Sequence, residues 1–559
     1  MVSEIGSAPA HAAIEVNPRA RFEIMGAIML ALFLGALDQT IVGPVLPKIS
    51  TELKGADFYT WVVTAYLVTS TAAIPIYGKL SDYFGRKPML ITGIVLFLIG
   101  SVLSGLSQTM WQLILFRGVQ GLGAGALFPI SLAVIGDLFT PAERGKYQGL
   151  FGGVFGVAFL VGPFLGGVLT DNLSWHWIFF VNIPVGLVSL YLIGRLLPMV
   201  HPAEARFTLD IPGVVTFVGA VVPVLVALTL AENGNWGDPY VLGWFAVGFV
   251  FLMAFIVAEA KAADPMIPLD LFRNRTFAVS AVASFFAVFG FSVLIIFLPL
   301  WFQIVQGAST TASGYLLFPF LMGLIFSSIL AGLLVSRTGR YKNLLLVAMV
   351  LMIAGLSLFS NLRADTPNPI LWSWMLIAGL GVGPTMAIFT LIVQNDVPFN
   401  RLGTATSDLT LFRQIGTSVG LTVAFTLFRN NLTWGLIHDS VIKAGAPSAA
   451  VPVAAPAGFD PGSLTSVGGS TNSAFAHIPA ALQGFYVSGF HQAFSIAVAD
   501  SVWIGVGAAA LSLVAILALK EKPLRAHFHA DQAARSGLQG STAGPAAGPT
   551  AGRAAGAAD

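Results

Sequence analysis

Fourteen long apolar runs limit the fold of this chain more than any other feature of its sequence. Each run has roughly 20 residues or more with few charges, which is the length that an α-helix needs to cross a bilayer core of about 30 Å. Of the 559 residues, 56% are hydrophobic and only 10% are charged, whereas a soluble domain has about 25% charged residues. The sequence therefore predicts an all-α protein that crosses a membrane many times.

The expected spans have boundaries that are uncertain by several residues. They lie at about residues 22–46, 59–78, 89–106, 111–137, 145–170, 176–197, 210–231, 240–260, 276–305, 311–335, 341–361, 370–396, 403–428 and 490–519. Because the number of spans is even, both termini should lie on the same side of the membrane.

The basic residues indicate which side that is. Of the 28 Lys and Arg residues, about 21 lie in one set of loops and terminal segments and five lie in the other set, while Arg117 and Arg413 fall inside spans. Loops that remain in the cytoplasm carry an excess of Lys and Arg. We therefore expect a multi-pass protein of the cell membrane with both termini in the cytoplasm.

The composition also excludes several classes of function. The chain has no cysteine, which excludes disulfides and thiolate metal sites. The basic residues are scattered, so nothing indicates a nucleic-acid partner. The sequence has no G-x-x-x-x-G-K-[ST] phosphate loop, no H-E-x-x-H and no histidine cluster, so we expect no cofactor, no metal and no enzymatic activity.

An internal repeat divides the chain. "GKLSDYFGRKP" (78–88) and "GLLVSRTGRYK" (332–342) each join two spans by a tight basic turn, and both contain Gly-Arg. Their offset of 254 residues fits six spans plus an inserted pair. Repeated halves that bind substrate between them are typical of secondary transporters. The expected parts are a tail (1–21), a six-helix bundle (22–200), two inserted helices (201–265), a second six-helix bundle (266–520) and a disordered tail (521–559).

The second bundle contains a long outer loop at about 429–489. Its flanks, "NLTWGLIHDSVIKAG" and "IPAALQGFYVSGFHQAF", are mixed in polarity at helical spacing. They could extend the last two spans beyond the membrane as a helical hairpin, or lie flat at the interface.

Several motifs, taken together and in order, resemble those of a known family. "GKLSDYFGRKP" resembles the signature loop of the major facilitator superfamily, although Tyr83 stands where that loop usually has arginine. "LILFRGVQGLGAGAL" (113–127) is similar to its fourth-span motif and "GVFGVAFLVGPFLGGVL" (153–169) to its antiporter motif. "LDQTIVGPVLP" (37–47), "WHWIFFVNIPVG" (175–186) and "MIPLDLFRNRTF" (266–277) resemble segments of the fourteen-span drug:proton antiporter family.

The resemblance implies roles for two groups of residues. The first is a conformational latch made by the repeated loop, with Ser336 in place of the acid in the second copy: Gly78, Asp82, Gly85, Arg86, Lys87, Arg337, Gly339 and Arg340. Physically, we also expect Asp82 to start the third-span helix, where the helix dipole favours a carboxylate, and it could also contact Arg86 or the second half. The alternative to a latch is that the basic residues of this loop only mark the topology. The second group is the bend in span 5 that governs how the halves rock: Gly156, Gly162, Pro163, Gly166 and Gly167.

Four charged residues inside spans are candidates for proton coupling. A charge at the centre of a span costs roughly 2.5–3.5 kcal/mol, so it persists where it is paired, hydrated or functional. Asp38 in span 1 and Arg117 in span 4 lie at similar depths and could form a pair, in which Asp38 exchanges a proton as the halves move. The alternatives are a static buried ion pair, or an Asp38 that only holds the backbone of span 1. Arg413 and Asp500 are the candidates of the second half. We expect Asp408 and His491 to lie near membrane edges in ordinary hydration.

The sequence thus favours a proton-coupled efflux antiporter of multidrug type, a monomer that exports amphipathic or lipophilic compounds by alternating access. Export of an endogenous lipid or lipid-linked product is the alternative within the same class. A membrane-embedded enzyme would need clustered nucleophiles or metal ligands, and a passive channel would not need the rocking motifs.

Overall fold

The computed structural model describes residues 18–55, 58–199, 210–231, 235–455 and 478–524. Both predicted tails, apart from residues 18–21 and 521–524, lie outside these residues. The start of the inserted pair and the middle of the outer loop also lie outside them. All regular structure in the described part is helical, and fourteen helices are long and apolar enough to cross a membrane. The predicted number of spans and their positions along the chain are confirmed.

The first half contains six spans. Their helices are α1 (Pro18–Val42) with its short continuation α2 (Leu46–Glu52), α3 (Tyr59–Phe84), α4 (Arg86–Gly105), α5 (Met110–Leu138), α6 (Pro141–Asn172), and α7 (Trp177–Phe180) followed by α8 (Asn182–Leu196). This half has its own apolar core, which includes Leu32, Phe97 and Ile130.

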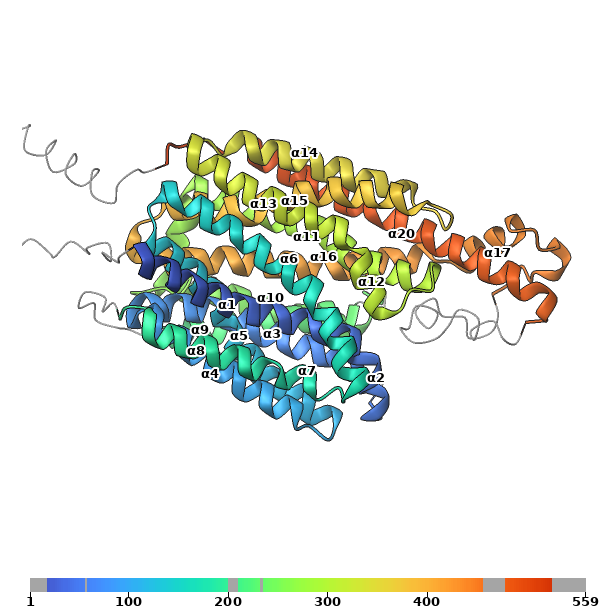
Figure 1. Cartoon of the computed structure of the whole chain (residues 1–559), viewed down its shortest axis with the longest axis horizontal. Helices are drawn as coiled ribbons and strands as arrows, with labels where there is room; N and C mark the ends of the chain where they lie inside the picture. The colour runs from blue at the N-terminus through green and yellow to red at the C-terminus, as the bar shows by residue number, and fades with distance from the viewer. Residues whose placement is uncertain (1–17, 56–57, 200–209, 232–234, 456–477, 525–559) are drawn as a thin grey trace, which may run out of the picture.

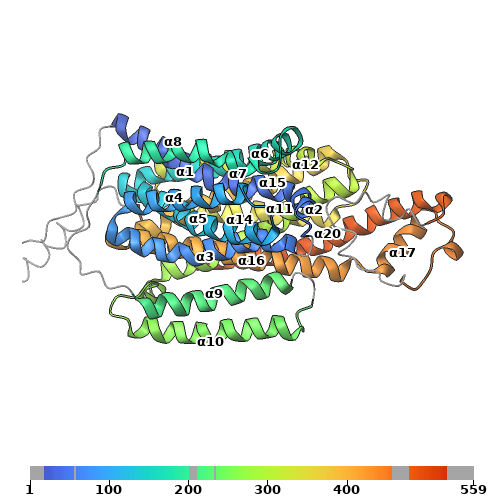
Figure 2. The same cartoon turned by 90° about the horizontal axis from the view of Figure 1, so that it is seen from below.

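Two further helices, α9 (Ile211–Ala231) and α10 (Pro239–Lys261), connect the halves in sequence. They lie side by side along one edge of the molecule, with α9 against α3 and α16 and α10 on the outside (Figure 2). Large apolar side chains such as Phe249, Val250 and Val257 are exposed along α10, as expected for a helix in contact with lipid.

The second half again contains six spans. Their helices are α11 (Arg275–Val305), the short α12 (Thr310–Leu316) with α13 (Phe318–Thr338), α14 (Lys342–Leu358), α15 (Asn368–Asp396), α16 (Leu402–Asn431) and α20 (Ala480–Leu517), with α17 (Trp434–Lys443) between the last two. Its core is centred on residues such as Phe297, Trp301 and Met352.

Local chemistry sets where these helices begin and end. Thr140 and Glu143 form a reciprocal capping box at the start of α6, which satisfies two backbone N–H groups that have no intrahelical partner. Asn274 accepts hydrogen bonds from the backbone at the start of α11. At the end of α13, Gly339 has a φ of 67°, a left-handed conformation that glycine adopts without strain.

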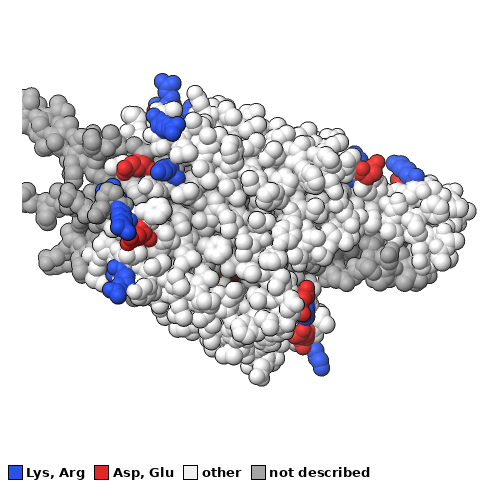
Figure 3. Space-filling model, in the orientation of Figure 1, with Lys and Arg blue, Asp and Glu red and all other residues white. Residues whose placement is uncertain are grey.

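The two ends of the bundle differ. We call the end at which α1 begins and α20 finishes the terminal end; there the loops of the repeat also lie. At the opposite end, α17 and the first turns of α20 project beyond the other helices as a hairpin (Figure 1). On the face shown in Figure 3, charged side chains gather at the two ends and the surface between them is almost entirely uncharged. This arrangement suits a protein whose middle is surrounded by hydrocarbon.

Candidate functional site

Asp38 and Arg117 meet inside the first half. α1 carries the carboxylate and α5 carries the guanidinium, and Arg117 donates a hydrogen bond of 2.7 Å to Asp38. Both side chains are withdrawn from solvent, with exposed fractions of 0% for Asp38 and 2% for Arg117. The geometry that the sequence suggested as possible is thus present, in a place where the two charges interact with little screening.

Two amides and one hydroxyl complete the surroundings of Asp38. Gln120 and Asn182 donate hydrogen bonds of 2.7 Å and 3.0 Å to its other oxygen, and Gln120 accepts one from Arg117. Ser101 accepts a hydrogen bond from Asn182 and donates to a backbone carbonyl. Both oxygens of Asp38 thus accept hydrogen bonds although the side chain is buried, as buried polar groups require.

The segment "WHWIFFVNIPVG" explains how Asn182 reaches that site. Trp175 donates its indole N–H to Glu52 at 2.8 Å and stacks on His176 with ring centroids 3.8 Å apart. Burial lowers the pKa of His176, which keeps the ring neutral near pH 7. The anchored turn leads through α7 into α8, whose first residue is Asn182.

The loop "GKLSDYFGRKP" joins the two halves at the terminal end. Asp82 accepts hydrogen bonds from the backbone N–H of Gly403 at 3.0 Å and of Thr404 at 2.7 Å, and from the Thr404 hydroxyl. It also pairs with Arg86 at 2.5 Å. The expectation that Asp82 starts α4 is wrong, because α3 continues to Phe84. Its carboxylate instead caps the start of α16 in the other half.

Close backbone approach supports this contact. A Cβ on Gly78 would lie 2.2 Å from the Ser407 hydroxyl of α16, so only glycine fits there. Arg86 is held from the other side by Asp137 at 2.9 Å, Gly85 adopts a φ of 90°, and Lys87 is only half-buried. The first copy of the loop therefore joins the two halves through hydrogen bonds, ion pairs and close backbone packing.

The second copy of the loop is different. The side chains of Arg337 and Arg340 are exposed, and within the described residues neither forms an ion pair. Ser336, which replaces the acid, donates only to a carbonyl of its own helix. The repeat is thus symmetric in sequence and topology but asymmetric in its contacts.

A second contact between the halves was not predicted. Gln394 of α15 accepts a hydrogen bond from Gln148 at 2.8 Å, and its backbone carbonyl accepts one from Arg144 at 3.1 Å. Gln394 also donates to the carbonyl of Leu132. Together with Asp82, this buried network closes the terminal end of the interface between the halves.

The glycines of α6 face two different partners. Cβ atoms on Gly149 and Gly156 would collide with Ser328 and Ile325 of α13, and those on Gly162 and Gly166 with Thr40 and Ile41 of α1. Helix faces made of small residues let two helices approach closely in a membrane, where lipid gives no hydrophobic driving force for their association.

The expected bend lies beside these contacts. Pro163 is inside α6, and Gly167 faces Thr311 of the second half. The residues expected at the bend therefore lie on a helix of the first half that contacts α1 of its own half and α12 and α13 of the other half.

A model of the Major Facilitator Superfamily matches residues 28–421. The chain belongs to the major facilitator superfamily. Two relatives from Bacillus subtilis (strain 168) are the Multidrug transporter protein MdtP and the Multidrug resistance protein 3. The first is 37% identical over 420 residues, 75% of this chain and 77% of its own length. The second is 37% identical over 414 residues, which are 74% of this chain and 80% of its own length.

Solved structures of this superfamily share the fold. The proton:xylose symporter XylE superposes with a TM-score of 0.58 at 15% identity, over 91% of this chain and 98% of its own. The human organic anion transporter MFSD10 superposes with a TM-score of 0.58 at 15% identity, over 90% of this chain and 100% of its own. The fold and the family of this transporter are therefore established, and its relatives are consistent with the fourteen-span drug:proton antiporter family.

The charged candidates in the second half of this transporter do not form a pair. Arg413 donates to the Ser284 hydroxyl at 2.8 Å and to the carbonyls of Thr385 and Met386, all of them neutral. Asp500 is exposed on the face of α20 that also presents Trp503 and Leu511. Neither residue forms an ion pair within the described part of the chain, so the second half has no counterpart of the Asp38–Arg117 pair.

Asp408 differs most from its expected surroundings. The prediction that it lies in ordinary hydration near a membrane edge is wrong, because its exposed fraction is 0%. Neither carboxyl oxygen has a hydrogen-bond partner among the described residues. The error arises because distance from the end of a span says nothing about which neighbours cover that end.

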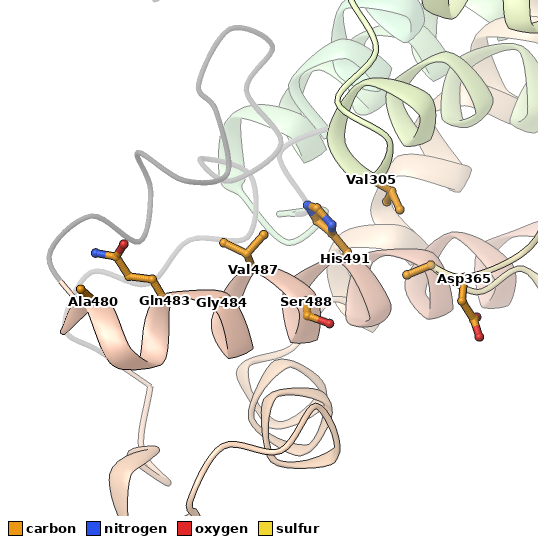
Figure 4. A pocket seen from close by; sticks show the side chains of 9 residues that line it. Val305, Asp365, Ala480, Gln483, Gly484, Val487, Ser488 and His491 are labelled. Carbon is orange, nitrogen blue, oxygen red and sulfur yellow. The ribbon is translucent and has the colours of Figure 1, made fainter.

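His491 lies at the end of the second half opposite the terminal end, beside a hollow of about 750 Å³ at the base of the hairpin (Figure 4). Val305 lies close to His491 at one end of this hollow, and Ala480 and Gln483 line the other end. The residue is half-buried, but its Nε2 atom is buried without a hydrogen-bond partner among the described residues, so the expectation of ordinary hydration is wrong for this nitrogen.

Proposed function

We propose that the protein is a proton-coupled efflux antiporter that exports amphipathic or lipophilic compounds by alternating access. Its terminal end faces the cytoplasm, it lies in the cell membrane, and it works as a monomer. Support comes from relatives that are named multidrug transporters and from the excess of basic residues in the loops of the terminal end.

The buried Asp38–Arg117 pair is the observation that carries the proposal. If Asp38 takes up a proton, Arg117 loses its counter-ion while still buried. An uncompensated buried charge is strongly unfavourable, so protonation favours a conformation that admits water to this region. Uptake of a proton and movement of α1 against α5 are thereby linked.

The available energy is sufficient for export. One proton that crosses a potential of 100 mV releases about 2.3 kcal/mol. At about 1.4 kcal/mol for each factor of ten, this supports roughly a 50-fold gradient of substrate.

Proteoliposomes test the proposal. A pH gradient is imposed, and movement of a lipophilic cationic dye is followed for the wild type, Asp38→Asn and the control Asp171→Asn, whose carboxylate is exposed. We expect Asp38→Asn to slow gradient-driven transport at least about tenfold and Asp171→Asn to match the wild type. Wild-type rates in well-folded Asp38→Asn would contradict the proposal.

Export of an endogenous lipid is the second candidate, and the projecting hairpin favours it. α20 has 38 residues, which gives a length of about 57 Å, nearly twice the bilayer core of about 30 Å. Its extension packs closely on α17, where Gly489 approaches Val441. This surface could guide an apolar molecule away from the membrane. Transport of a lipidated cargo by vesicles that do not transport dye would favour this candidate over the first.

A further inference from the structure

Asp408 is fully buried, and an apolar cluster lies further along the same helix. Leu411 and Ile415 lie on the same face of α16, three and seven residues further along. They pack in a cluster with Phe217 of α9 and Phe255 of α10. Because neither oxygen of Asp408 accepts a hydrogen bond, an ionised carboxylate there would have neither water nor a donor to stabilise it. The carboxyl group therefore holds a proton in this conformation.

A second carboxyl group lies in the same region. Glu259, near the end of α10, has an exposed fraction of 3%. One of its oxygens accepts hydrogen bonds from the backbone of Met266 and Ile267 at 3.2 Å and 3.3 Å, while the other has no partner among the described residues. Glu259 thus joins the inserted helices to the segment that leads into the second half.

The charged groups around Asp408 offer no counter-ion. Asp408 forms no ion pair with any described residue, and the two charged groups that act on it, Glu259 of α10 and Asp82 of α3, are acidic. The nearby cations of α3 and α4 are engaged elsewhere. Lys79 binds Asp264 and the carbonyl of Pro265, and Arg86 binds Asp82 and Asp137 of α5. Asp210, just before α9, adds negative charge near Glu259, and Lys79 adds positive charge there.

The position of Asp408 connects it to the junction between the halves. It lies one helical turn beyond Thr404, whose N–H and hydroxyl bind Asp82, and next to Ser407, which packs on Gly78. If Asp408 loses its proton, its charge is repelled by Asp82 and Glu259 and requires water. Both effects favour separation of α16 from α3 and from the inserted pair.

We propose that Asp408, with Glu259, forms a second proton-binding site at the terminal end, whose protonation holds the two halves together there. Loss of the proton to water at that end favours opening toward it. The proposal rests on the proposed proton-coupled function, and it gives the inserted helices a part in that function through Glu259.

Distance measurements between spin labels test this site in the full chain. Because the chain has no cysteine, labels can be placed only where they are wanted, at Lys146→Cys in α6 and Asn400→Cys before α16, both exposed. In the wild type, we expect the short distance of the closed state at about pH 5.5 and a population at longer distance at about pH 8.5.

The variants then identify the responsible group. Asp408→Asn mimics the protonated acid, so it should remain closed at both pH values. Asp408→Glu should restore the response, Glu259→Gln should move its midpoint to lower pH, and the exposed Asp171→Asn should behave as the wild type. A wild-type response in Asp408→Asn, or no response in the wild type, would overturn the proposal.

Transport assays and the distance measurement together separate this proposal from the proposed function. If Asp38→Asn abolishes gradient-driven transport while Asp408→Asn keeps the pH response, the second site is wrong and the proposed function stands. If the wild type exchanges substrate without any proton movement, the proposed function itself fails. Thermal unfolding of each variant shows whether it is folded. If Asp408→Asn does not fold, the responses of Asp408→Glu and Glu259→Gln still decide the test.

Discussion

Individual residues show what a single sequence reveals about a buried site. Asp38 and Arg117 stand out because charges are rare in long apolar runs, and the structure joins them. Gln120 and Asn182 were missed, because amides are common in such runs and their partners depend on how α5 and α8 are rotated. Asp408 was misjudged because the helices that pack on α16, such as α3 and α11, are far from it in sequence.

Removal of Arg117 alone should be more harmful than removal of the whole pair. Arg117→Met leaves Asp38 as an uncompensated buried charge, which we expect to cost about 3–5 kcal/mol of stability. The double variant Asp38→Asn/Arg117→Met should recover most of this loss. Thermal unfolding of the purified protein measures it, with the exposed Lys146→Met as control. Equal melting temperatures for Arg117→Met and the wild type would show that the pair is not buried as described.

Individual helices show which contacts follow from a sequence repeat. The glycine face of α6 follows from helical spacing, but the sequence does not indicate that one part of it meets α13 and another part α1. Likewise, both copies of the repeated loop can be found by eye, whereas only the first contains the acid that caps α16. Whether a loop makes a contact depends on the opposing helix, which its own sequence does not describe.

The asymmetry of the two loops leads to a prediction about transport. Asp82→Ala removes the cap of α16 and the partner of Arg86, so the closed junction is weakened and transport should fall about tenfold or more. Arg337→Gln, in the exposed second copy, should stay within about twofold of the wild type. Dye transport by proteoliposomes compares the two. Equal losses in both variants would mean that the second copy also acts as a latch, in another conformation.

The whole molecule follows from the sequence at a coarse level. Fourteen spans could be counted because hydrocarbon requires long apolar helices, and the repeat indicated two halves. The closed terminal end was not predictable, because alternative conformations have the same apolar pattern. The hairpin of α17 and α20 was one of two open possibilities, since helical spacing alone does not distinguish a projecting helix from one that lies flat.

The side of the membrane on which each end lies can be checked directly. Thr338→Cys, at the terminal end, should be protected in intact cells from a thiol reagent that does not cross membranes, since basic loops remain in the cytoplasm. Asp439→Cys, in the exposed part of the hairpin, should react. The reverse pattern would invert the proposed orientation and the direction of transport.

The central claim is that movement of substrate is tied to a proton carried by Asp38. The most direct measurement records proton flux and substrate flux together in proteoliposomes, with a pH-sensitive dye inside. The wild type should move protons in one direction whenever substrate moves in the other. Asp38→Asn should still exchange labelled for unlabelled substrate but move no protons with it. Proton flux that accompanies substrate equally well in Asp38→Asn would contradict the account.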